Sequence, residues 1–192
     1  MSAVERRLPA EPAVTLAACA ADVLELAALR GRASEFREIA AGGVRLAALG
    51  RSEWTYPQLT LNVRPERWLL LGPPAALPLA TWQARCAGPG AAVDLSSALA
   101  AFHLAGPAAR EVLARGCRLD LDPQAFPSGY AAATIMAQVS TVFAALPSGL
   151  LLLTPSSTAR HFRDWLAASA KPFGCVEGRD VSLEDLCGDE RP

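Results

Sequence analysis

The sequence predicts a single α+β domain made of two tandem strand-helix-hairpin-helix units. Three observations support this fold class. The chain has 192 residues, 52% of them hydrophobic, which suits one buried core better than two. Apolar residues repeat with period two in some segments and with the helical period in others, as strands and helices require. The same order of patterns occurs twice, with Pro and Gly residues at the joints.

The first half of the predicted domain covers residues 21–97. A strand over Asp22–Ala28 leads through Gly31 into a helix that ends at Gly42 and Gly43. The apolar face of this helix is Ala33, Phe36, Ile39 and Ala40. A hairpin follows, with Leu59, Leu61 and Val63 alternating in its first strand, a turn at Pro65 and a second strand over residues 68–71. A helix over residues 74–87 closes the half.

The second half, residues 98–175, repeats this order. A strand over residues 101–105 runs through Gly106 and Pro107 into a helix with Ala109, Val112 and Leu113 on one face. Tyr130 to Phe143 supplies a long hairpin arm, a turn at residues 147–149 follows, and residues 150–153 form the paired strand. The last helix starts near Ser156 and has the apolar face Ala159, Phe162, Leu166 and Ala170.

Each half is too small to bury its own sheet, so we expect the halves to pack as one pseudo-symmetric body over residues 21–175, with helices on one side of largely antiparallel strands. Residues 1–20 contain charges and prolines and are predicted to form an extended arm that is ordered only if something holds it. Residues 176–192 are predicted to be an acidic C-terminal tail.

Composition excludes several classes of function. The net charge is −1 and the arginines are scattered, with Lys171 the single lysine, so we expect no binding to nucleic acid. No apolar run reaches membrane-spanning length, which predicts a soluble cytoplasmic protein without membrane contact. The five cysteines are far apart and include no C-x-x-C pair, so they are interpreted as reduced, mostly buried thiols. A nearly neutral, strongly apolar chain also suggests a subunit whose surface is partly covered by a partner.

The residues that could perform catalysis do not form a known constellation. His161 lies between Arg160 and Arg163 on the last helix, and the paired serines at 96–97 and 156–157 are not in a G-x-S-x-G turn. The glycines form neither G-x-G-x-x-G nor a phosphate-binding loop. The sequence therefore predicts no catalytic, cofactor-binding or metal-binding residue in this chain.

The most distinctive stretch runs from Asp94-Leu95-Ser96 to Leu104-Ala105-Gly106-Pro107-Ala108-Ala109 and Leu113. This D-[VL]-S element followed by L-x-G-P-x-A-x-x-x-L resembles the first, folate-binding domain of the aminomethyltransferase (glycine-cleavage T-protein) superfamily. Gly116-Cys117-Arg118-Leu119-Asp120-Leu121 comes directly afterwards, and this addition is similar to the gamma subunit family of heterotetrameric sarcosine oxidase. The resemblance covers about residues 20–174.

The resemblance implies a non-catalytic gamma subunit in a cytoplasmic enzyme complex that demethylates sarcosine to glycine oxidatively. It implies alpha, beta and delta subunits as partners, chiefly alpha. FAD, FMN, NAD and tetrahydrofolate are then expected in the alpha and beta subunits, and zinc in the delta subunit, with no cofactor in this chain.

Two alternatives remain open from the sequence. Residues 129–134, Gly-Tyr-Ala-Ala-Ala-Thr, depart from the expected family pattern, so the equivalent subunit of N-methylglutamate dehydrogenase is one alternative. A standalone folate-binding, aminomethyltransferase-like protein is the other. Its iron–sulfur-maintenance form has a K-G-C-[FY]-x-G-Q-E signature, whereas Cys117 here follows Arg115-Gly116 and precedes Arg118.

Four residues are candidates for contact with a partner: Trp54, Tyr56, His103 and Arg110. Aromatic side chains bury large areas and often dominate association, and Trp54 lies between two polar residues, whereas Trp68 begins an apolar strand typical of a core. His103 faces away from the core side of its strand, and Arg110, in the first turn of its helix, is expected to reach solvent or a carboxylate.

Overall fold

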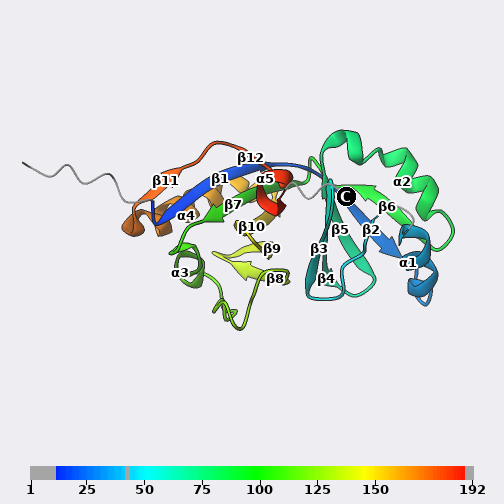
Figure 1. Ribbon diagram of the computed structural model, residues 1–192, viewed down its shortest axis with the longest axis horizontal. Coiled ribbons are helices and arrows are strands. Elements are labelled where there is room, and N and C mark those ends of the chain that lie inside the picture. The colour runs from blue at the N-terminus through cyan, green and yellow to red at the C-terminus, as the bar shows by residue number, and fades with distance from the viewer. Residues whose placement is uncertain (1–11, 42–43, 189–192) are drawn as a thin grey trace, which may run out of the picture.

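The computed structural model describes residues 12–41 and 44–188. It is a single α+β body, as the sequence predicts, and its strands form two largely antiparallel sheets. Each sheet is covered on its outer side by two helices, and the inner sides of the sheets face each other (Figure 1). The layers therefore run helix, sheet, sheet, helix, so each sheet is buried on both faces.

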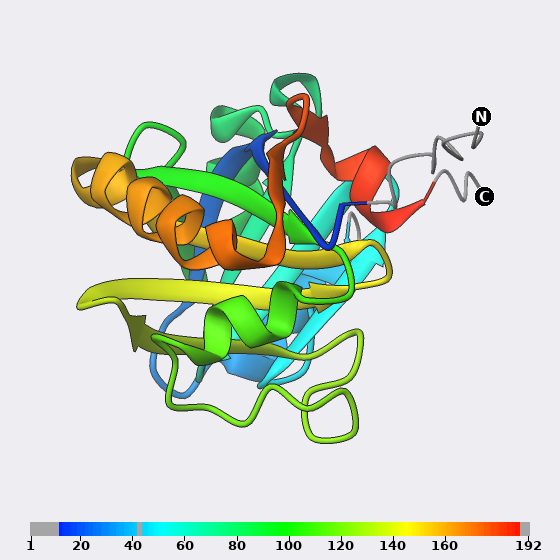
Figure 2. The same ribbon diagram turned by 90° about the vertical axis from the view of Figure 1, so that its left-hand side faces the viewer.

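The larger sheet has the strand order β11-β1-β7-β10-β9-β8, with β12 paired to β1. Its strands are β1 (Val14–Ala20), β7 (Leu99–Ala105), β8 (Ala131–Met136), β9 (Val139–Leu146), β10 (Gly149–Pro155), β11 (Cys175–Glu177) and β12 (Val181–Ser182). Helices α3 (Ala109–Ala114) and α4 (Ala159–Ala170) lie on its outer face (Figure 2).

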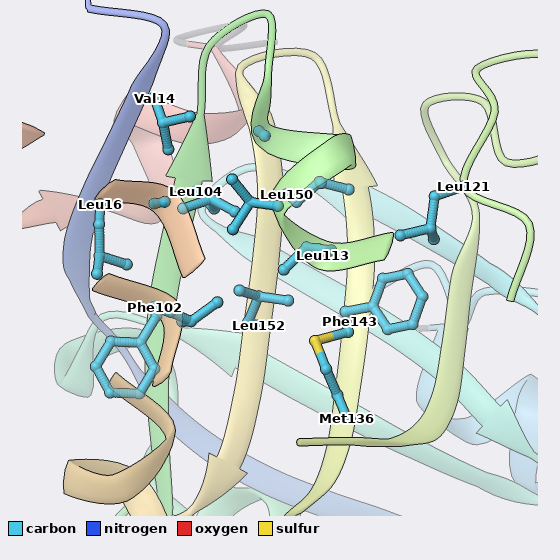
Figure 3. Packing of buried hydrophobic residues seen from close by; sticks show 14 of the residues in the cluster. Val14, Leu16, Phe102, Leu104, Leu113, Leu121, Met136, Phe143, Leu150 and Leu152 are labelled. Atoms are coloured by element: carbon cyan, nitrogen blue, oxygen red, sulfur yellow. The ribbon is translucent and has the colours of Figure 1, made fainter. Parts of the chain in front are cut away.

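The core on this outer face is built from alternate residues of the strands (Figure 3). Phe102 and Leu104 of β7 and Leu150 and Leu152 of β10 point to the same side. The predicted helix faces contribute the rest, because Val112, Leu113, Phe162, Leu166 and Ala170 are all buried here. The predicted apolar faces of these two helices are therefore confirmed.

The smaller sheet has the order β3-β4-β5-β2-β6. Its strands are β2 (Asp22–Ala28), β3 (Arg51–Thr55), β4 (Gln58–Arg64), β5 (Arg67–Gly72) and β6 (Gly90–Asp94). Helices α1 (Ala33–Ala41) and α2 (Leu79–Cys86) cover its outer face, with the 3-10 turn η1 (Pro74–Ala76) before α2 where one continuous helix was predicted. Phe36 stacks on Trp68 there at 5.6 Å between ring centroids, and Trp82 is also buried, so both tryptophans are core residues.

The core between the sheets comes from the opposite sides of the same strands. Leu59 and Leu61 of β4 and Leu71 of β5 meet Leu151 and Leu153 of β10. Sheet packing of this kind explains why strands such as β10 are continuous runs of leucine rather than alternating patterns.

The predicted N-terminal arm is corrected over residues 14–20. Strand β1 pairs with β7 through contacts such as Leu16 with Leu104, and Val14 and Leu16 are buried in the outer core. The strand was missed because alanines at positions 17 and 18 hide its alternation. Residues 1–11 of the predicted arm lie outside the described residues.

The predicted acidic tail is corrected over residues 176–188. This segment forms β11, β12 and the short helix α5 (Leu183–Cys187). Ser182 and Asp185 form a capping box at the start of α5, while Leu183 and Leu186 are buried between the sheets. Acidic composition alone predicts a tail, but one of these acidic residues, Asp185, caps a helix that packs on the core. Residues 189–192 lie outside the described residues.

The predicted hairpin arm over residues 130–143 is two strands. Strand β8 turns into β9 at Ala137 and Gln138, whose φ angles are 49° and 66°. Two-residue hairpin turns with both central residues at positive φ usually contain Asn or Gly, so this turn has no sequence signal. The predicted helix terminators Gly42 and Gly43 lie outside the described residues.

Candidate partner interface

Trp54 lies on the edge strand β3 and points toward the space between the sheets. It is half-buried against the inter-sheet core and meets Tyr56 edge to face, with the ring centroids 6.2 Å apart. Its indole Nε1 is buried without a hydrogen-bond partner among the described residues. Trp54 therefore offers only part of its surface to a partner, and Tyr56 is also half-buried, next to a cis Tyr56-Pro57 bond.

His103 faces the side of β7 opposite Phe102 and Leu104, as predicted. The side chain is only 6% exposed, and its Nε2 lies 3.3 Å from Ser148 Oγ. Ser148 Oγ in turn donates to the carbonyl oxygen of Leu186 in α5, at 2.9 Å. His103 thus meets the C-terminal segment of its own chain.

The hydrogen bond between His103 and Ser148 runs in the wrong direction for a serine nucleophile and its general base. A serine hydroxyl has one proton, and Ser148 directs it to the Leu186 carbonyl oxygen. His103 Nε2 therefore donates to Ser148 rather than accepting its proton, whereas an activated serine needs the reverse. Burial also lowers the pKa of His103, while a hydrogen bond to the backbone of Ser148 raises it by less. The pair joins β7 to the turn before β10 and to α5.

Arg110 projects from the first turn of α3 over the loop of residues 117–127. Its Nη1 donates to the carbonyl oxygen of Leu121 at 2.6 Å and to that of Phe126 at 2.8 Å. Among the described residues no carboxylate pairs with Arg110, and its half-buried side chain closes this loop. The loop itself packs Leu121 and Phe126 into the outer core.

A cavity of about 230 Å³ opens where the two sheets separate, and no sequence pattern predicts it. Leu61, Val63 and Leu69 line it on the smaller sheet, and Leu99, Val142 and Leu153 on the larger. Arg64 lies at its rim with the ion pair of Glu25 and Arg67. The cavity is apolar inside and polar at its mouth.

The thiols of Cys19 and Cys187 are poorly suited to chemistry. Burial, helped by Cys187 and Asp185 nearby, raises the pKa of Cys19 to about 12, and burial raises that of Cys187 to about 12. Both side chains therefore stay protonated near neutral pH, and a protonated thiol is a weak nucleophile and metal ligand. Over residues 12–41 and 44–188 there is no cluster of His, Cys, Asp or Glu side chains suited to a metal ion. In the same ranges no helix is long and apolar enough to span a membrane.

Comparisons with known proteins found similar solved structures. No family model and no curated protein matches the chain. A solved structure, heterotetrameric sarcosine oxidase from Corynebacterium sp. U-96 in complex with pyrrole 2-carboxylate, matches with a TM-score of 0.75 and 28% sequence identity. The match covers 89% of this chain and 90% of that chain. A protein from Agrobacterium tumefaciens matches with a TM-score of 0.39 and 10% identity, over 88% of this chain and 95% of that one, and this likeness carries no argument.

The two coverages are nearly equal, so the matched chain of the oxidase has about the same length as this one. The likeness therefore extends over a whole small subunit rather than over part of a large one. In sequence and in fold, this chain is similar to a subunit of heterotetrameric sarcosine oxidase, and its predicted resemblance to the sarcosine oxidase gamma subunit family is confirmed.

Proposed function

We propose that this chain is the non-catalytic gamma subunit of a heterotetrameric oxidase of the sarcosine oxidase type. The observation that carries the proposal is the match to a chain of that enzyme over 89% of this sequence and 90% of the other. Because the match spans most of both chains, it supports a role for this chain like that of the small subunit that it resembles. The chain then acts by binding the other subunits.

The side chains that suggested chemistry from the sequence support a structural role. Arg110 satisfies two carbonyl oxygens of its own loop, and His103 links β7 to the segment that holds α5. Both are used to join elements of this chain. The reaction, oxidative demethylation of sarcosine to glycine, belongs in this proposal to the alpha and beta subunits with their flavins, nicotinamide dinucleotide and tetrahydrofolate, and zinc to the delta subunit.

The fold relation to the first domain of aminomethyltransferase is also part of the proposal. The sheet orders are β3-β4-β5-β2-β6 and β8-β9-β10-β7-β1. In these orders β3, β4, β5 and β2 of the first half occupy the same positions as β8, β9, β10 and β7 of the second. A duplicated unit of this kind supports the predicted pseudo-symmetry. In the larger sheet, the N-terminal strand β1 takes the position that β6 has in the smaller sheet.

The test is co-expression of this chain, carrying an affinity tag, with the candidate flavoprotein subunits. We expect a yellow complex to purify with the tag and to oxidise sarcosine, while the chain alone is colourless and inactive. Oxidation of N-methylglutamate instead of sarcosine would assign the chain to the corresponding dehydrogenase. A solitary monomer that binds tetrahydrofolate would overturn the subunit assignment and support the standalone alternative.

A further inference from the structure

Strand β8 lies at one edge of the larger sheet. One of its lateral edges pairs with β9, and the other faces away from the sheet. The outer side is covered at two points by other segments of the chain. The amide of Ala131 donates to the Gly50 carbonyl oxygen at 3.0 Å, and the amide of Ala137 donates to that of Gly116 at 3.4 Å. The strand is therefore bare between these two contacts.

The backbone groups that this gap exposes follow from the strand period. Because successive residues of a strand direct their N–H and C=O groups to opposite sides, Ala133 and Ile135 point the same way as Ala131. Among the described residues no backbone hydrogen bond reaches the outward groups of Ala133 or Ile135. Each of these residues therefore offers one donor and one acceptor to an added strand.

The side chains of β8 give this edge no protection against another strand. Natural edge strands are usually short, charged or interrupted by proline. Strand β11 has three residues and contains Glu177, while β3 contains Arg51 and Glu53. Strand β8 reads Ala-Ala-Ala-Thr-Ile-Met, without charge or proline, and the side chain of Ile135 is 68% exposed.

The surface beside the gap is positively charged. Arg115 and Arg118 line a hollow next to Thr134 and Ile135, together with Trp165. Both arginines are exposed, and neither forms an ion pair with a residue in the described ranges. Arg115 is held over the Phe173 ring at 4.8 Å, which fixes its position at the rim. An incoming chain thus meets apolar surface at Ile135 and cations beside it.

We propose that the outer edge of β8 is the docking site for an extended segment of a partner subunit, which adds a strand at Ala133 and Ile135. Strand addition uses main-chain hydrogen bonds for affinity and side-chain contacts for specificity. The segment has an apolar residue against Ile135 and an acidic residue against Arg115 or Arg118. A second copy of this chain is a poor occupant, because pairing β8 with itself brings the same cations together. The inference rests on the proposed subunit function and names the surface that it uses.

Hydrogen exchange on the purified complex tests the site directly. In the free chain the amides of Ala133 and Ile135 should exchange rapidly, while those of Thr134 and Met136, which face β9, are protected. In the complex, Ala133 and Ile135 should become at least about tenfold slower, since a new hydrogen bond must open before exchange. Unchanged exchange at both amides in a complex that does form would overturn the docking site.

Matched substitutions provide the second test. Ile135→Lys places a charge on the edge, and Arg118→Glu reverses the charge beside it. The controls are Val93→Lys, a 50% exposed position on the edge strand β6, and Arg160→Glu on α4. The two β8-side variants should bind the partner subunits about tenfold more weakly than the wild type, equivalent to about 1.4 kcal/mol, with unchanged thermal midpoints. The controls should bind within about twofold of the wild type.

The outcomes separate the two proposals. If the wild-type chain binds no oxidase subunit at all, the proposed function fails and the docking site fails with it. If the wild type binds and Ile135→Lys binds equally well, only the docking site is wrong. A wild-type homodimer that Ile135→Lys converts to a monomer would assign the edge to a second copy of this chain and would also overturn the inference.

Discussion

At the scale of single residues, the polar side chains that suggest function from the sequence hold the fold together. Arg110 lies in the most distinctive motif of the chain, yet both of its hydrogen bonds go to carbonyl oxygens of residues 121 and 126. His103 lies on the inter-sheet side of β7, where its side chain contacts Ser148. Residue type and motif predict an interface for Arg110 and His103. Their hydrogen-bond partners instead come from loops of the same chain that sequence patterns do not bring together.

Replacing Arg110 with Met should destabilise the chain by about 2–4 kcal/mol, because two buried carbonyl oxygens lose a charged donor while the apolar stem is kept. Urea denaturation followed by circular dichroism measures the loss. Arg160→Met on the exposed surface of α4 is the control and should change stability by less than about 0.5 kcal/mol. Equal denaturation midpoints for Arg110→Met and the wild type would contradict the loop-closing role.

His103 should make stability depend on pH below its ordinary pKa. Burial lowers the pKa of His103 in the folded chain below its ordinary value of 6.5, so the unfolded chain takes up this proton first. The stabilisation is therefore complete above about pH 6.5 and is lost as the pH falls below that value. The carboxyl groups of Asp94 and Asp185 have pKa values below 3.8, because Ser96 and Ser182 donate hydrogen bonds to them, and so act in a lower range.

Denaturation midpoints of the wild type and of His103→Gln at pH 7.5 and pH 5 measure this dependence. The wild type should lose more stability than the variant between the two values, since Gln does not take up a proton. Identical losses in both proteins would show that His103 does not carry the effect.

At the scale of elements, Gly106 shows how a turn fixes the place of a strand. Its φ is 104°, and a Cβ there would lie 2.5 Å from the Ala13 carbonyl oxygen, next to the start of β1. Gly88 has a similar φ of 101° with nothing within 4 Å of such a Cβ. Gly106→Ala should therefore cost about 1–3 kcal/mol more than Gly88→Ala in thermal or urea unfolding. Equal costs would mean that β1 does not press on this turn.

The elements that could be predicted are those with a complete local pattern. The apolar faces of α3 and α4 and the presence of strand β4 follow directly from residue spacing. Strand β1, the turn at Ala137 and Gln138, and helix α5 were missed because each depends on contacts elsewhere. β1 is held by β7, the turn lacks Gly or Asn, and α5 is stabilised by Leu183 and Leu186 in the inter-sheet core.

At the scale of the whole molecule, the four layers bury most of both faces of each sheet, while edge strands such as β8 stay at the surface. The candidate site could be predicted only in part, because the motif identified a subunit family while the predicted interface residues are wholly or partly committed to their own chain. The bare edge of β8 had no sequence signal, since an edge position is set by the sheet order. We therefore expect the protein to act by associating with partner subunits.

Native mass spectrometry of the co-expressed, affinity-purified material shows whether the chain assembles with the oxidase subunits. We predict that this chain, 20.1 kDa in mass, is found in one copy within a larger assembly that contains the flavin-bearing subunits. Gas-phase dissociation of that assembly should release the chain without a bound flavin. Detection of the chain only as a free 20.1 kDa species, in material that also contains an assembled and active oxidase, would contradict the account.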